Sequence, residues 1–126
     1  MRGLHQDMIK ENIRINVVGP WMTRTNMTEF FADHWISKAM PYNSPADVAS
    51  AILICSTANR GGAGISHMGA VLPFTGKIVF LGGGKSYEIE DRLQALQPQW
   101  FGEENTKAVA LGDIFLNEMA SSMVED

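Results

Sequence analysis

The sequence predicts an α/β fold, because two short apolar segments with strand character are separated by segments with helical signals. Residues 13–18 (IRINVV) and 77–81 (KIVFL) have the apolar, β-branched character of buried strands, and each is followed directly by glycine. Between them, residues 44–47 (SPAD) mark a helix start, with serine as the N-cap, proline at the first helical position and aspartate at the third. We therefore expect about two strands and four to five helices.

The first strand separates two predicted helices. Residues 1–11 indicate the end of an amphipathic helix, and Asn12 suits the left-handed position that closes it. Gly19-Pro20 ends the strand, because proline cannot donate a hydrogen bond to a sheet. A helix over residues 27–39 follows, with Thr25 or Thr28 as its cap. Its predicted apolar face carries Met27, Phe30, Phe31 and Trp35.

Three further helices are expected in the rest of the chain. The helix that begins at Ser44 should bury Val48, Ile52 and Cys55, and the glycine-rich segment 60–76 should form a long loop. Ser86 is the expected cap of the next helix, and Glu103 and Glu104 begin the last one. The apolar positions of these two helices are Ile89, Leu93 and Leu96, then Val109, Leu116 and Met119.

The composition is that of an ordinary globular domain, with 45% hydrophobic and 19% charged residues, and we expect one domain over residues 1–126. Apolar runs are too short to span a membrane, and no signal-type apolar segment follows the N-terminus. The net charge of −4, without a basic cluster, argues against a nucleic-acid partner. The single cysteine, Cys55, rules out an internal disulfide and favours a reducing, cytoplasmic location.

The sequence gives little support for a metal-binding or phosphate-binding motif. The three histidines, His5, His34 and His67, lie far apart in sequence and show no recognised metal-ligand spacing, so we expect no metal site. Residues 84–86 (GKS) copy the end of a P-loop, but the position of the required first glycine holds Val79. Residues 62–64 (GAG) begin a dinucleotide-type pattern that His67 breaks. We therefore expect ordinary loops at both glycine clusters.

Residues 13–25 (IRINVVGPWMTRT) carry a more specific pattern. They resemble the segment I-R-V-N-x-V-x-P-G-x-V-x-T of the short-chain dehydrogenase/reductase family. Residues 44–49 (SPADVA) resemble a late helix of that family, and residues 76–84 (GKIVFLGGG) resemble its final strand. Residues 85–100 are similar to fungal members, so the resemblance covers nearly the whole chain.

The resemblance implies the C-terminal fragment of a doubly wound (Rossmann-type) parallel sheet. It also implies NAD(P)-dependent oxidoreduction of a hydroxyl or carbonyl group on an apolar small molecule. The family's glycine-rich cofactor turn and its catalytic Tyr-x-x-x-Lys are absent from this chain, since Tyr42 and Tyr87 are followed four residues later by Ala46 and Asp91. We therefore expect that NAD or NADP is not bound by this chain alone.

Site residues follow from the same resemblance. It implies that Pro20, Thr23 and Thr25 hold the nicotinamide end of the cofactor, although Trp21 replaces the usual glycine. No catalytic acid–base pair is evident, and His34 is a candidate because histidine is the residue type best suited to proton transfer in enzymes. The substrate pocket is expected from Trp21, Asn26, Phe30, Phe31 and Trp35. Filling a hydrophobic core is the alternative role for these aromatic residues.

Three functions remain open at this point. The chain is an oxidoreductase segment, a truncated member that binds a small molecule and acts as a cofactor-free cyclase or isomerase, or a non-catalytic interaction module. The family's dimer interface implies a homo-oligomer through residues 44–58 and 77–81. A two-stranded sheet with an open edge also favours self-association.

Overall fold

The computed structural model describes residues 7–58 and 73–122, which form two compact units that divide after Asp91. The first unit contains β1 (Val17–Pro20), α2 (Glu29–Ser37), α3 (Pro45–Thr57), β2 (Ile78–Gly82) and β3 (Lys85–Glu88). Helix α4 (Glu90–Ala95) crosses the division, and α5 (Gln97–Phe101) and α6 (Glu103–Ser122) belong to the second unit. Most of the predicted glycine-rich loop, together with His5 and His67, lies outside the described residues.

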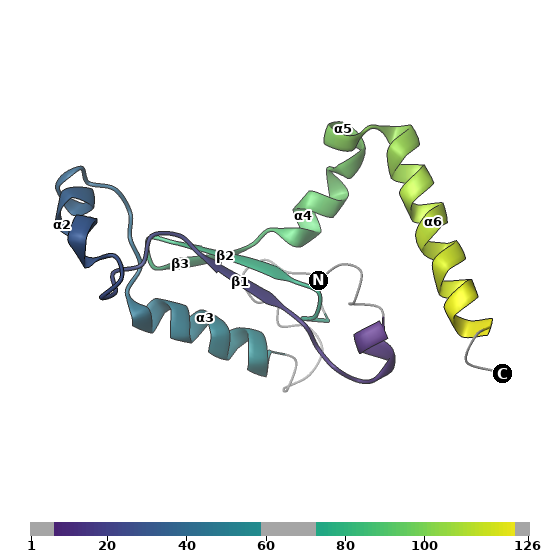
Figure 1. Cartoon of the computed structure of the whole chain (residues 1–126), viewed down its shortest axis with the longest axis horizontal. Helices are drawn as coiled ribbons and strands as arrows, with labels where there is room; N and C mark the ends of the chain where they lie inside the picture. The colour runs from purple at the N-terminus through teal and green to yellow at the C-terminus, as the bar shows by residue number, and fades with distance from the viewer. Residues whose placement is uncertain (1–6, 59–72, 123–126) are drawn as a thin grey trace. The chain divides into compact units, whose positions relative to one another are not determined.

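The α/β prediction is confirmed, with a three-stranded sheet in the order β1-β2-β3 (Figure 1). Strands β1 and β2 run parallel, with Val18 opposite Val79 and Pro20 opposite Leu81. Strand β3 is antiparallel to β2, so the sheet is mixed rather than wholly parallel. The expectation of two strands missed this third one.

The predicted helix start at Ser86 is wrong, because residues Lys85–Glu88 form β3 instead. Gly83 and Gly84 have φ angles of 60° and 73°, which are the conformations required by a two-residue turn in a β-hairpin. The glycine cluster that copies part of a P-loop is therefore the turn between β2 and β3. Its conformation explains why glycine stands at both positions.

Helix α4 begins after β3, where a buried carboxylate satisfies its first backbone donors. Glu88 accepts hydrogen bonds from the backbone N–H groups of Glu90 at 2.7 Å and Asp91 at 3.2 Å. The Asp91 carboxylate in turn pairs with the buried ammonium of Lys77 at 2.6 Å. Glutamate at a strand end is an unusual helix cap, which explains why the sequence pattern places this helix start too early.

Strand β1 begins at Val17, four residues later than the predicted start at Ile13. Just before the strand, the side chain of Asn16 makes the hydrogen bonds to the neighbouring segments. The Asn16 side chain accepts from the backbone N–H of Lys77 at 3.0 Å and donates to the carbonyls of Cys55 and Phe74. One amide side chain therefore connects the start of β1, the end of α3 and the segment before β2. The sequence pattern shows only alternating apolar residues here, so it does not indicate this role of Asn16.

Helix α3 packs against β1 and β2 and provides the core of the first unit (Figure 1). The buried cluster consists of Cys55, Ala58, Phe74 and Val79, with Val18 packed against it. Cys55 is thus a small buried hydrophobic residue, as predicted, and burial raises the pKa of its thiol, which keeps it protonated. The expectation that Ile52 is buried is wrong, since it lies on the outer side of α3 with 53% of its surface exposed, whereas Ala51 is buried.

Both ends of α3 are closed by side chains. Ser44 and Asp47 form the predicted capping box, in which the Ser44 hydroxyl accepts from the Asp47 backbone N–H at 3.2 Å. Asp47 accepts from the backbone N–H and the hydroxyl of Ser44, both at 2.7 Å, and these bonds lower the pKa of its carboxyl. At the other end, the Arg14 guanidinium donates to the carbonyls of Ser56 and Ala58. A cation at this end also complements the helix dipole.

The second unit is helical. Pro98 lies in the first turn of α5, where proline needs no hydrogen-bond partner, and α6 starts at Glu103 as predicted. No helix within residues 7–58 and 73–122 combines the length and the apolar character needed to cross a membrane.

The capping box gives a first test of the fold. We expect Ser44→Ala to lower the free energy of unfolding by about 1 kcal/mol, because the backbone N–H of Asp47 loses its side-chain acceptor and the Asp47 carboxylate loses the Ser44 hydroxyl as a donor. Ser50→Ala, on the exposed side of the same helix, is the control and should change stability little. Urea denaturation followed by circular dichroism measures both. Equal stability of the two variants would contradict the capping role.

Candidate functional site

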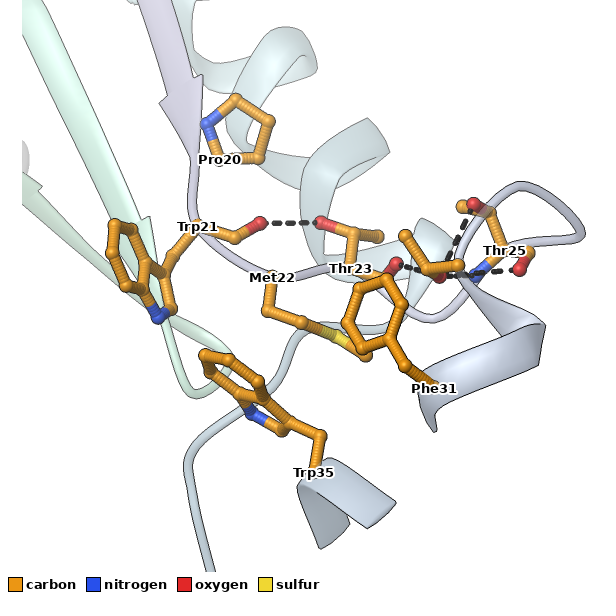
Figure 2. Close-up of a pocket in the computed structure, with 8 residues that line it drawn as sticks. Pro20, Trp21, Met22, Thr23, Thr25, Phe31 and Trp35 are labelled. Atoms are coloured by element: carbon orange, nitrogen blue, oxygen red, sulfur yellow. Dashed lines mark hydrogen bonds between the residues drawn. The ribbon is translucent and has the colours of Figure 1, made fainter. Parts of the chain in front are cut away.

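A cavity of about 440 Å³ lies between the end of β1 and helix α2. This volume falls within the range of small-molecule sites in proteins, roughly 300–1,000 Å³. Its lining residues are Pro20, Trp21, Met22, Thr23, Thr25, Thr28, Phe31 and Trp35 (Figure 2).

The sheet fixes the position of this cavity. Pro20 is paired with Leu81, and the Trp21 backbone N–H donates to the Leu81 carbonyl at 2.8 Å. The cavity therefore opens where the chain leaves the carboxyl end of a strand in a parallel pair. In open α/β sheets, this end of the strands is where ligands bind.

Aromatic rings form much of the cavity wall. The ring centroids of Trp21 and Trp35 lie 6.4 Å apart at an interplanar angle of 57°, and Phe31 lies 6.4 Å from Trp35. Phe80 on β2 supports the Trp21 ring from outside the cavity, also at 6.4 Å. The indole N–H of Trp35 donates to the Pro41 carbonyl at 2.9 Å, which fixes this ring in place. These rings give the pocket apolar walls.

The threonines form the polar side of the pocket (Figure 2). The hydroxyl of Thr23 donates to the Trp21 carbonyl at 3.0 Å. The hydroxyl of Thr28 donates to the Thr23 carbonyl at 2.7 Å and accepts from the Thr25 backbone N–H at 2.9 Å. Thr28 is also the N-cap residue of α2, but its side chain makes no capping hydrogen bond because it is used to hold the preceding loop.

The fully buried Asn43 anchors the same loop to the sheet. Its backbone N–H donates to the Met22 carbonyl at 2.8 Å, and its own carbonyl accepts from Arg24 at 2.9 Å. Its side chain donates to the Leu81 carbonyl at 3.0 Å and accepts from the Gly84 backbone N–H at 2.9 Å. Asn43 therefore joins the pocket loop, the end of β2 and the hairpin turn.

Charged groups lie beside the pocket rather than in it. Arg24 pairs with Glu29 at 3.0 Å and with Asp33 at 3.6 Å, and the hydrogen bond from Arg24 lowers the pKa of the Glu29 carboxyl. These side chains are exposed, so the pairs add little stability. None of the residues that line the cavity carries a charge. The site therefore suits a neutral ligand.

The structure brings together most of the residues expected from the sequence. The three residues predicted to hold the nicotinamide end, Pro20, Thr23 and Thr25, all line the cavity. Of the five residues predicted for the substrate pocket, Trp21, Phe31 and Trp35 line it. Asn26, Phe30 and His34 are exposed and are not among its lining residues, and Phe30 has 87% of its surface exposed. Whether any of these nine residues acts on a ligand stays a prediction.

Three contributions to the site were not expected from the sequence. Met22 and Thr28 line the cavity, and Asn43 holds the loop. The position of Met22 within the motif of residues 13–25 could have indicated it. Asn43 carried no signal, because its partners are about forty residues away in sequence.

We expect Asn43→Ala to lower the free energy of unfolding by about 1–3 kcal/mol, because the Gly84 backbone N–H loses its acceptor and the Leu81 carbonyl keeps only the Trp21 backbone N–H of these two donors. It should also increase hydrogen exchange at the Met22–Arg24 loop. The matched control is Asn105→Ala, since Asn105 makes one exposed side-chain bond, to the Phe101 carbonyl. Hydrogen exchange followed by mass spectrometry measures the loop directly. Unchanged exchange in a folded Asn43→Ala protein would contradict the anchoring role.

Comparison with known proteins adds one relative. The chain is 26% identical over 125 residues to the short-chain dehydrogenase/reductase ATR7 of Stachybotrys chlorohalonatus. The match covers 93% of this chain but 39% of that protein. No protein-family profile and no solved structure matches the chain. These findings support a partial segment that is similar to short-chain dehydrogenases/reductases.

Proposed function

We propose that this chain binds an apolar small molecule in the cavity between β1 and α2, as the ligand-binding segment of a protein of short-chain dehydrogenase/reductase type. One observation carries the proposal. The motif that resembles this family, residues 13–25, ends in the loop that lines an uncharged cavity with aromatic walls. Similarity to a fungal short-chain dehydrogenase/reductase supports the same assignment.

The reaction that we propose for the whole protein is NAD(P)-linked oxidoreduction of a hydroxyl or carbonyl group on that molecule. This chain spans 39% of the length of its relative, and its own sequence contains no Tyr-x-x-x-Lys pair. We therefore assign to this chain the binding and orientation of the ligand. The proton-transfer pair would come from elsewhere in the assembled protein.

The cavity fits one end of a nicotinamide cofactor better than the whole dinucleotide. The Thr23 hydroxyl oxygen can accept a hydrogen bond from a carboxamide NH₂, and a flat pyridine ring suits walls of tryptophan and phenylalanine. A pyrophosphate needs basic side chains or clustered backbone N–H groups, and the residues that line the cavity include no cation. When bound, the cofactor would supply or accept a hydride beside the substrate.

A second candidate function is binding and conversion of a small molecule without cofactor. It is supported by the aromatic and threonine side chains that line the cavity. His34 would then be the candidate for proton transfer, although its side chain is exposed on α2. Turnover by the isolated chain that is lost in His34→Ala would establish this function in place of the first.

We expect the isolated chain to bind NADH or NADPH more weakly than micromolar. The lining residues offer hydrogen bonds and ring contacts to the nicotinamide alone, and these must offset the entropy lost on association. Isothermal titration calorimetry with each nucleotide tests this expectation. Micromolar affinity would mean that the chain holds a phosphate site of its own.

We expect Trp35→Ala to weaken the binding of neutral apolar probes about tenfold, because the cavity loses one of its walls. Suitable probes are 2-naphthol, 2-methoxynaphthalene and decahydro-2-naphthol, each measured by ligand-observed NMR. Trp100→Ala is the matched control, since Trp100 is an exposed tryptophan of the second unit. The proposed function fails if none of the three probes binds the unmodified chain.

We also propose that copies of the chain associate through residues 44–58, because α3 exposes Ile52 and Leu53, the latter with 62% of its surface. Sedimentation velocity at micromolar concentration should then show a dimer or larger species. Leu53→Glu should shift it toward monomer, whereas Leu111→Glu on α6, also at an exposed leucine, should not. A monomer at all concentrations would contradict this interface.

A further inference from the structure

The hydroxyl hydrogens of Thr23 and Thr28 are directed at the protein itself. Each hydroxyl has one hydrogen to donate and two lone pairs that accept. Thr23 donates to the Trp21 carbonyl, and Thr28 donates to the Thr23 carbonyl. Thr25 and Thr28 have their hydroxyl oxygens 3.4 Å apart, and either hydroxyl can be the donor of that pair.

The hydroxyl oxygen of Thr23 can therefore act as an acceptor. Thr28 already accepts from the backbone N–H of Thr25. Within the described residues, no donor reaches the hydroxyl oxygen of Thr23. Thr23 is also half-buried, whereas Thr25 is exposed.

A ligand that donates a hydrogen bond is favoured by this arrangement. A donor can use the lone pairs of Thr23 while its bond to the Trp21 carbonyl stays intact. A ligand that only accepts a hydrogen bond from Thr23 must first break that bond, and the Trp21 carbonyl would then lose this donor. Thr23 therefore discriminates between ligands by the direction of the hydrogen bond.

The walls select for shape. The Trp21 ring lies 6.4 Å from those of Trp35 and Phe80, and the Trp35 indole N–H donates to the Pro41 carbonyl. In Figure 2, the two indoles lie to one side of Met22 and the Phe31 ring lies to the other. A flat ring among them makes stacked and edge-to-face contacts that a saturated ring of equal size does not make.

We propose that the ligand of this pocket is a planar aromatic molecule that carries a hydrogen-bond donor at its edge, such as a phenolic O–H or a ring N–H. This proposal rests on the proposed function, since it concerns the same pocket. Thr23 is the acceptor that sets the preference for a donor. Trp21, Phe31 and Trp35 set the preference for an aromatic ring.

The test compares three probes of similar size on the full chain, by ligand-observed NMR titration. We expect 2-naphthol to bind about fivefold or more tightly than 2-methoxynaphthalene, which lacks the donor, and than decahydro-2-naphthol, which lacks the aromatic ring. Equal binding of all three would overturn the proposed ligand class and leave the proposed function standing. Absence of binding by all three would overturn both.

Substitutions at Thr23 test whether its hydroxyl oxygen causes the preference for a ligand that donates a hydrogen bond. Thr23→Val should remove the preference of 2-naphthol over 2-methoxynaphthalene, and Thr23→Ser, which keeps the hydroxyl, should restore it. Thr57→Val is the matched control, since its hydroxyl donates to the Leu53 carbonyl within α3 and lies outside the pocket. If Thr23→Val and Thr57→Val both retain the full preference while folded, Thr23 is not the acceptor. Tighter binding of 2-methoxynaphthalene than of 2-naphthol would overturn the assigned direction of the hydrogen bonds.

Discussion

The parallel pairing of β1 with β2 is the constraint on which the first unit depends. The two strands are separated by more than fifty residues, so every contact between them closes a long loop at an entropic cost. Two asparagines complete the pairing at its two ends. Asn16 bonds to Lys77, Cys55 and Phe74 before the strands begin, and Asn43 bonds to Leu81 and Gly84 where they end. A buried amide suits this role because it donates and accepts at once.

The site follows from this pairing. Since Pro20 is held opposite Leu81, the chain must leave the sheet at Trp21, and Asn43 then holds the next residues against the hairpin. Helix α2 adds Phe31 and Trp35 to the wall. The hydroxyls of Thr23 and Thr28 donate to backbone carbonyls of the turn, and both residues line the cavity. A sheet, a buried amide and a short aromatic helix are thus sufficient to build an apolar pocket with a polar edge.

Local signals in the sequence predicted local structure well. The capping box of Ser44 and Asp47 formed as expected, and Asn12 adopts the left-handed conformation, with a φ of 57°. The motif of residues 13–25 contains part of the loop that lines the cavity. Features that depend on distant partners were missed. The helix at Ser86 was wrong because two glycines turn the chain back into a hairpin, and Asn43 was overlooked because its partners come from another strand. Phe30 and Phe31 are both phenylalanines of the same helix, so the sequence does not distinguish them. In the structure, Phe30 is exposed.

The central claim is that a small molecule binds between Trp21 and Trp35. The chain contains three tryptophans, and the third, Trp100, lies in the second unit and serves as an internal reference. Incorporating 5-fluorotryptophan gives one ¹⁹F NMR signal for each, assignable by single substitution to phenylalanine. On titration with 2-naphthol, the account predicts that the signals of Trp21 and Trp35 shift together with one saturation curve, while that of Trp100 stays in place. Shifts confined to Trp100, or none at saturating probe, would contradict it.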